Sequence, residues 1–298
     1  MAQKGKWIIP LNEVPEGMAI HRYIVKKTDL MNKIALFNNY NAPDYIEAYL
    51  NVDHDYLLKS IFEASEIYGL HEFSYSGKSK GAACYSSASF TWNPDAIDKI
   101  SDDPHRATLG STVFKYGSAS LNGEKESSRN TYNDSYSFKE RTPFADYKGV
   151  KDLFDTFHRT IVRSRISTIH AGNSEATKAD FCWHDDELTF INLRMNIPVQ
   201  TTPNYVVQVL RGTTEDQLDI AEFPMKEKYA YVYDTHKLHR PLCKKLDTVD
   251  RINMIVGISP WFDFDKDSQS WISNEFYGEM HPFEIFANGH VSPLIKKL

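Results

Sequence analysis

Residues 181–199 read F-C-W-H-D-D-E-L-T-F-I-N-L-R-M-N-I-P-V, which joins a histidine and three consecutive acids to the start of a predicted β-strand. Acidic runs usually lie on solvated surfaces. This one follows two aromatic side chains and precedes an apolar segment of strand length, residues 188–198. We therefore expect the acids to lie at the edge of a hydrophobic core.

Further segments of strand length lie on both sides of this one, and each is bounded by turn residues. They are residues 163–169, 205–210, 228–233 and 251–260. Because the short strands follow one another without predicted helices between them, the pattern predicts an antiparallel sandwich or barrel.

The N-terminal half has a mixed character. A strand is predicted at residues 18–26, and apolar residues at three-to-four spacing predict a helix over residues 42–68, with an interruption at 51–55 that would split it. A second helix is predicted at residues 146–163. Residues 117–142 have hardly any aliphatic side chains, so they form either a lid over a site or a plain surface loop.

The composition indicates a soluble globular protein with a substantial core. Of its 298 residues, 41% are hydrophobic and 13% are aromatic. A formal net charge of −6 gives no bulk attraction to nucleic acid or to an anionic membrane. The sequence shows no membrane-spanning apolar run and no secretory signal, so we expect a cytoplasmic protein. Cys84, Cys182 and Cys243 do not make a disulfide framework.

His184 and Asp186 are separated by one residue, so on an extended strand their side chains project from the same face, and Asp185 projects from the other. An imidazole and a carboxylate on one face provide two ligands of a metal site. A third ligand has to come from a neighbouring strand. The stretch Y-V-Y-D-T-H-K-L-H-R-P, residues 231–241, offers His236 and His239.

Two histidines and one carboxylate form the facial triad of non-haem Fe(II) oxygenases, which leaves positions open for a cosubstrate and dioxygen. Such oxygenases commonly use 2-oxoglutarate, whose far carboxylate requires a cationic partner. Arg251 begins the next predicted strand, and an arginine can hold a carboxylate with two parallel hydrogen bonds. Arg251 could instead form a salt bridge with Asp247 or Asp250.

Several motifs resemble the core of one family of these enzymes. They are W-H-x-D (183–186), L-R-M-N-I-P-V (193–199), Y-D-T-x-x-x-H-R-P (233–241) and D-R-I-N-M-I-V-G-I-S-P-W-F (250–262). In order and spacing they are similar to the aspartyl/asparaginyl β-hydroxylase branch of the Fe(II)/2-oxoglutarate-dependent dioxygenases, over roughly residues 150–264.

The resemblance implies a mainly β fold with flanking α-helices around a double-stranded β-helix, which is a cupin-like jelly roll. It implies that His184, Asp186 and His239 bind the iron, with His239 preferred to His236. It also implies that Arg251 binds the far carboxylate of 2-oxoglutarate. Arg194 would contact either the cosubstrate or a substrate carboxylate.

In this interpretation residues 146–298 form the jelly-roll core with a C-terminal extension. Residues 1–145 form an α/β part that packs on the core and carries the polar loop. We expect the two parts to make one compact unit.

The implied activity is hydroxylation of an unactivated C–H bond, in which O2 and 2-oxoglutarate are consumed and succinate and CO2 are formed. The implied substrate is a small amino-acid-like molecule or a peptide, and Arg194 or Arg165 could hold its carboxylate. No nucleic-acid or membrane partner is expected. Two other classes stay open: a metal-dependent hydrolase or isomerase on a cupin-like barrel, which would not need Arg251, and a non-catalytic ligand-binding barrel.

Overall fold

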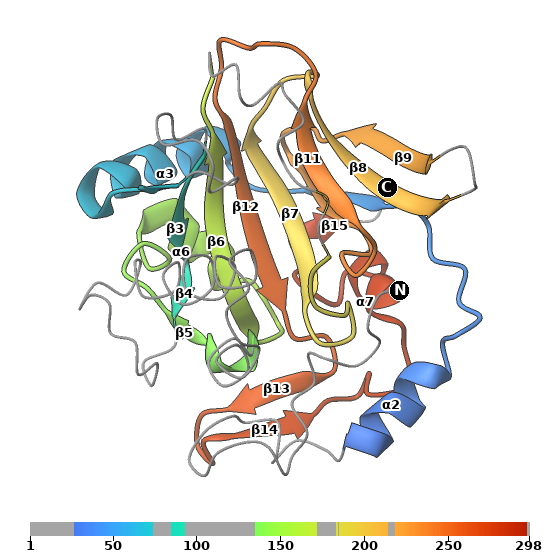
Figure 1. Ribbon diagram of the computed structural model, residues 1–298. Helices are drawn as coiled ribbons and strands as arrows, with labels where there is room; N and C mark the ends of the chain where they lie inside the picture. Colours follow the sequence, from blue (N-terminus) through green and yellow to red (C-terminus); the bar gives the residue numbers. More distant parts are fainter. Residues whose placement is uncertain are drawn as a thin grey trace, which may run out of the picture.

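Strands β6 to β12 form the centre of the structure and divide between two antiparallel sheets (Figure 1). The computed structural model describes residues 27–73, 85–92, 135–171, 183, 185–213 and 218–296. The central strands are β6 Ile161–Ile169, β7 Leu193–Gln200, β8 Tyr205–Thr213, β9 Leu218–Pro224, β10 Tyr229–Val232, β11 His239–Cys243 and β12 Arg251–Ile258.

The larger sheet has the strand order β15-β1-β10-β7-β12-β6-β3-β2, and the smaller sheet has the order β11-β8-β9. Along the chain, β7 lies in the larger sheet, β8 and β9 in the smaller, β10 in the larger, β11 in the smaller and β12 in the larger. Neighbouring strands of the larger sheet therefore come from distant parts of the chain. This is the arrangement of a jelly roll, and the predicted mainly β fold is confirmed.

The flanking elements extend the larger sheet and cover it. β1 Ile46–Leu50 pairs with β10, and β3 Tyr85–Ser89 pairs with β6. The other elements are α2 Lys27–Ala35, α3 His54–Tyr68, β2 His71–Phe73, β4 Thr91–Trp92, η4 Ser135–Ser137, β5 Glu140–Arg141, α6 Lys148–Phe154, β13 Phe262–Asp265, β14 Ser270–Ser273, α7 Pro282–Ala287 and β15 Ile295–Lys296. None of the helices in these described ranges is both long enough and apolar enough to cross a lipid bilayer.

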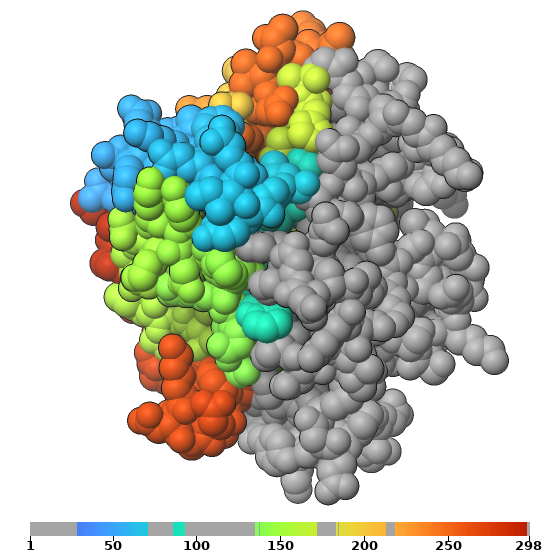
Figure 2. Space-filling view, turned by 90° about the vertical axis from the view of Figure 1, so that its left-hand side faces the viewer, coloured from blue at the N-terminus to red at the C-terminus, as the bar shows by residue number. Residues whose placement is uncertain are grey.

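Helices α3 and α6 pack together, and Figure 2 shows the blue segment of α3 and the green segment that includes α6 on one face of the molecule. The contact is close, because a Cβ at Gly149 would lie 2.9 Å from Ser60 Oγ. Gly149 N instead donates a hydrogen bond to that oxygen, over 3.1 Å. At the start of α3, the Asp53 carboxylate accepts a hydrogen bond from Tyr56 N and caps the helix.

Strands β7 and β12 are buried on both faces, and the two faces differ in character. Their alternate apolar side chains enter the main hydrophobic core, as Met195 and Ile197 do on β7 and Met254 on β12. The intervening side chains, which include Arg194 and Arg251, point the other way and line a pocket between the two sheets. Because successive side chains of a strand point to opposite faces, one face of each strand belongs to the apolar core and the other face to the polar pocket.

A β-bulge changes the register where β6 meets β12. Ile255 lies opposite Arg165, but Gly257 lies opposite Val162. An advance of two residues on β12 therefore corresponds to three residues on β6, so β6 carries one extra residue. Arg163 has a positive φ of 28° within the bulge. A Cβ at Gly257 would lie 2.2 Å from the carbonyl oxygen of Val162, so the close approach of the two backbones requires glycine.

The structure corrects several predicted boundaries. Residues 46–50 are the strand β1 and not the first part of a helix, because they pair with β10; only the second part, α3, is helical. The helix predicted at 146–163 ends at Phe154, and β6 begins at Ile161. β7 begins at Leu193 and not at 188. β9 was not predicted, since its inner and outer residues alternate imperfectly.

Two predicted features lie wholly or mainly outside the residues that the structure describes. The strand predicted at residues 18–26 lies outside the described residues, as does the polar loop up to residue 134. The end of that loop, residues 135–142, forms η4 and β5.

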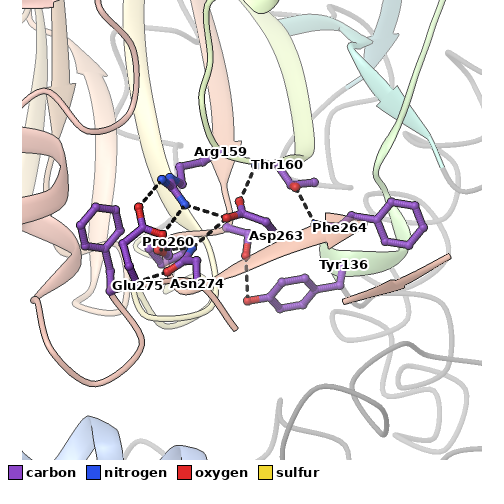
Figure 3. A network of polar contacts seen from close by, with 10 residues as sticks. Tyr136, Arg159, Thr160, Pro260, Asp263, Phe264, Asn274 and Glu275 are labelled. Atoms are coloured by element: carbon purple, nitrogen blue, oxygen red, sulfur yellow. Dashed lines mark hydrogen bonds and ion pairs between the residues drawn. The ribbon is translucent and has the colours of Figure 1, made fainter. Parts of the chain in front are cut away.

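A polar network attaches the β13–β14 hairpin to the start of β6 (Figure 3). Arg159 donates hydrogen bonds to Asp263 over 2.6 Å and to Glu275 over 2.7 Å. Asn274 donates to the same Asp263 carboxylate, and Phe264 N donates to Thr160 Oγ1 over 2.8 Å. The network fixes the chain beyond β12 against the edge of the core.

A buried histidine connects the N-terminal and C-terminal segments. The His281 ring stacks on Tyr40, with 3.8 Å between ring centroids. His281 Nδ1 also accepts a hydrogen bond from Phe283 N over 3.1 Å and caps α7, while Glu284 accepts from His281 N in return. Burial lowers the pKa of His281 from 6.5 to about 4, so the ring stays neutral and keeps its acceptor.

We predict that this histidine makes the free energy of unfolding depend on pH between 6.5 and 4. Above pH 6.5 the ring is neutral in both states. As the pH falls, the unfolded chain binds a proton that the folded chain rejects, so up to about 3 kcal/mol of stability is lost by pH 4. Urea unfolding of wild type and His281→Asn, which keeps a capping side chain, should show a flatter pH profile in the variant. Equal slopes would contradict this account.

Candidate active site

The pocket between the sheets holds most of the residues singled out from the sequence. One wall comes from β6, β7 and β12, and the other from β8 and β11. Its polar lining consists of Arg165, Ser167, Asp186, Arg194, Asn196, Tyr233, Thr235, His239, Arg251 and Asn253. Val207, Pro241 and Ile255 supply the apolar lining.

His239 and Asp186 meet inside this pocket. Their Nε2 and Oδ2 atoms lie 3.5 Å apart, and His239 is only 3% exposed. His239 Nδ1 lies 2.9 Å from the carbonyl oxygen of Lys237, which can only accept, so Nδ1 carries the proton. Nε2 is therefore the nitrogen left to face the carboxylate, and an Nδ1–H bonded to a backbone carbonyl is typical of a metal-binding histidine.

Asp186 is held from two sides. Its backbone N–H donates to the carbonyl of Thr235 over 2.8 Å, which ties the acidic segment to the chain just before β11. Its carboxylate accepts a hydrogen bond from the guanidinium of Arg194. Arg194 is 6% exposed, and it enters the pocket near the start of β7. The structure thus places Arg194 directly against Asp186.

Arg251 lies in the same pocket, at the start of β12, and is 5% exposed. Asp250 and Asp247, the two acids that the sequence offered as alternative partners, also make contacts of their own. Asp250 accepts from Ala171 N over 2.7 Å and contacts the ring of His170. Hydrogen bonds from Thr202 and Asn204 hold the pKa of Asp247 below its usual range.

Tyr233 is a functional candidate that sequence reasoning missed. Burial, together with the charge of Asp186, raises its pKa to about 12, although Arg251 and Arg194 act in the opposite direction. Its hydroxyl therefore stays protonated at neutral pH. Its ring packs edge-on against His239, with centroids 5.3 Å apart. In the sequence, only its place in the Y-D-T motif set it apart from the other tyrosines.

Asn196 and Asn253 were also missed. They lie in the pocket wall, and Asn253 Nδ2 donates to Asn196 Oδ1 over 2.9 Å. They alternate with core residues on the same strands as Arg194 and Arg251, so the two-residue period was the signal that could have found them.

The remaining predicted residues are placed differently. His236 is not among the described residues that line the pocket, and its backbone N–H donates to Asp234. His184 lies outside the described residues. Within the described ranges, no cluster of three metal-binding side chains is complete. The structure therefore brings together Asp186, His239 and Arg251 of the predicted set, with Arg194 beside them.

No protein-family model and no curated protein matches this chain. Among solved structures, it is similar to the non-haem α-ketoglutarate-dependent epimerase of nogalamycin biosynthesis, with 10% identity over 78% of this chain and 84% of the other, and a TM-score of 0.39. The carbocyclase of the same biosynthesis gives 10% identity, 79% and 85% coverage and a TM-score of 0.39. A Pseudomonas putida prolyl-4-hydroxylase is 7% identical over 76% of this chain and 98% of its own, with a TM-score of 0.36. Likenesses this weak assign no activity, so the chemistry has to be inferred from the residues of this chain.

We predict that the Arg194–Asp186 pair contributes to stability as a unit. Arg194→Met leaves a largely buried carboxylate without its guanidinium partner and should lower the free energy of unfolding by about 2 kcal/mol. The double variant Arg194→Met/Asp186→Asn should recover part of that loss, because no unpaired charge remains. Urea denaturation measures both. Additive losses in the double variant would show that the pair is not coupled.

Proposed function

We propose that this protein is an Fe(II)/2-oxoglutarate-dependent oxygenase that hydroxylates an unactivated C–H bond of a small amino-acid-like or peptidyl substrate. One observation carries the proposal: His239 Nε2 and Asp186 Oδ2 converge to 3.5 Å in a pocket that also contains the buried guanidinium of Arg251. The convergence suits a metal, and the guanidinium suits a dicarboxylic cosubstrate.

The donor atoms fit a non-haem iron ion. His239 would bind it through Nε2 and Asp186 through a carboxylate oxygen, with His184 proposed as the third ligand from the same segment as Asp186. Imidazole and carboxylate donors of this kind, with open coordination positions, are typical of Fe(II) oxygenases. Arg194 would orient the Asp186 carboxylate from behind.

The cosubstrate would lie along the wall formed by β6 and β12. Arg251 would bind the far carboxylate of 2-oxoglutarate as a two-pronged donor. Ser167 and Asn253 face each other across the two strands next to it, and both line the pocket. The protonated hydroxyl of Tyr233 offers a further donor between Arg251 and the metal-binding pair.

Bound together, Fe(II), 2-oxoglutarate and dioxygen supply the oxidising power for an unactivated C–H bond, with succinate and CO2 as co-products. The chain contributes placement and the exclusion of water. Val207, Pro241 and Ile255 provide apolar surface around the polar groups. Placement is demanding, since an error of about 1 Å can cost on the order of a hundredfold in rate.

We predict that Asp186→Ala and His239→Ala abolish both tight binding of Fe(II) and formation of succinate from 2-oxoglutarate. Arg251→Ala should retain iron binding but raise the KM for 2-oxoglutarate by about 30-fold, because a charge-assisted pair is lost. Succinate can be measured without a known substrate, by the slow uncoupled turnover of the cosubstrate. Metal affinity can be measured by anaerobic titration calorimetry.

His236→Ala is the matched control, because His236 stands three residues before His239 on the same stretch. It should leave iron affinity close to that of wild type. Loss of iron binding in His236→Ala but not in His239→Ala would overturn the ligand assignment. A different result would favour a metal-dependent hydrolase or isomerase instead. In that case wild type would bind iron but form no succinate, and Arg251→Ala would not change the binding of 2-oxoglutarate.

A further inference from the structure

We propose that the side chains of Trp183 and Arg240 form a clasp around β11 that positions the segment carrying Asp186. This role rests on the proposed oxygenase function, in which the same segment supplies the metal ligands Asp186 and His184. Both members of the clasp are positioning residues, and neither contacts the substrate or the cosubstrate. Three features support the clasp: the two faces of β11, the contact between the two side chains, and the polar contacts that hold Arg240.

The metal-binding histidine and Arg240 lie on opposite faces of the same strand. Successive side chains of β11 point to opposite sides of the smaller sheet. His239 and Pro241 line the pocket, so Arg240 points to the outer face. Gln208, which stands opposite Arg240 on β8, follows the pocket-lining Val207 and therefore also lies on the outer face.

The segment before β7 contacts both sides of β11. The Trp183 ring lies over the guanidinium of Arg240, with 4.6 Å between the ring centroid and Cζ. Three residues later, the Asp186 carboxylate lies beside His239 on the pocket side, and Asp186 N donates to the carbonyl of Thr235. β11 stands at one end of the strand order β11-β8-β9, so a segment can reach both of its faces (Figure 1). Trp183 and Asp186 thus hold this strand from opposite sides.

A row of polar contacts on the outer face fixes Arg240. Arg240 Nε donates to Gln208 Oε1 over 2.9 Å, and Gln208 Nε2 donates to Glu222 Oε2 over 2.8 Å. Hydrogen bonds from Lys244 and Gln208 hold the pKa of Glu222 below its usual range, so this carboxylate stays charged. The guanidinium is therefore held in place where the Trp183 ring packs on it. Both members of the contact are half-buried, and a cation–π contact is stronger when it is shielded from water.

The charge of Arg240 and its contact with Trp183 have opposite effects on metal binding. A guanidinium near a metal site repels the ion, so by charge alone the removal of Arg240 would strengthen metal binding. By contrast, groups that orient metal ligands commonly account for about 10- to 100-fold in metal affinity. The clasp therefore requires that removal of Arg240 weaken metal binding, and the sign of the change separates the two effects.

The first test is anaerobic titration calorimetry with Fe(II). Arg240→Gln and Trp183→Ala should each lower the affinity for Fe(II) by about tenfold. Arg240→Lys keeps a cation and Trp183→Phe keeps a ring, so each should recover part of the loss. The double variant Arg240→Gln/Trp183→Ala should bind Fe(II) about as well as the weaker single variant, because both changes remove the same contact.

Lys139→Gln is the matched control. Lys139 Nζ lies 4.5 Å from the centroid of the Phe264 ring, in a cation–π contact that does not belong to the pocket lining. Its loss should leave the affinity for Fe(II) within about twofold. Unchanged or higher affinity in Arg240→Gln would overturn the clasp, and so would additive losses in the double variant.

The second test needs no metal. The Asp186 amide donates to Thr235 and should exchange slowly with solvent, as should the Asp155 amide, which donates to Lys151 over 2.8 Å at the end of α6. Arg240→Gln should speed the exchange of Asp186 by about tenfold and leave that of Asp155 unchanged. Labelling with ¹⁵N-aspartate reports both signals, and Asp186→Asn identifies the Asp186 signal by its loss. No acceleration, or equal acceleration of both amides, contradicts a local clasp.

The clasp and the oxygenase function fail in different ways. If wild type binds neither Fe(II) nor 2-oxoglutarate, the oxygenase function is wrong, and the exchange of the Asp186 amide still decides whether the clasp holds this segment. If wild type binds both, and Arg240→Gln changes neither the affinity for Fe(II) nor the exchange of Asp186, only the clasp is wrong.

Discussion

The meeting of His239 and Asp186 depends on how the chain alternates between two sheets. His239 begins a strand of the smaller sheet, while Asp186 precedes β7 of the larger one. The two side chains meet because Asp186 N is bonded to Thr235, just before β11, and because Arg194 holds the carboxylate from β7. An imidazole whose Nδ1 is already bonded to a backbone carbonyl then has one nitrogen left, and it faces the carboxylate.

The same strands build both the core and the site. On β7 and β12 the apolar side chains fill the interior, and the alternate positions supply arginine and asparagine to the pocket. The bulge at Arg163 and the close approach at Gly257 shift the register of β6 against β12. The cationic groups are therefore spread along the pocket, with Arg251 at one end and Arg165 nearer the metal-binding pair.

Much of this arrangement could be predicted from the sequence, because the two-residue period and the motif spacing are local signals. The β class, Asp186, His239 and Arg251 fall into this group. β1 could not be recognised, because the spacing of its apolar residues also suits a helix. Only its pairing with β10 makes this segment a strand. The contact of Arg194 with Asp186, and the presence of Tyr233 in the pocket, depend on tertiary packing that no local pattern records.

The most direct test of the account is an anaerobic titration with Fe(II) followed by 2-oxoglutarate, monitored by visible absorption. A keto acid that chelates Fe(II) produces a weak charge-transfer band. We expect this band in wild type, its absence in His239→Ala, and a higher concentration of 2-oxoglutarate to produce it in Arg251→Ala. Iron binding by wild type without the band at saturating 2-oxoglutarate would contradict the account.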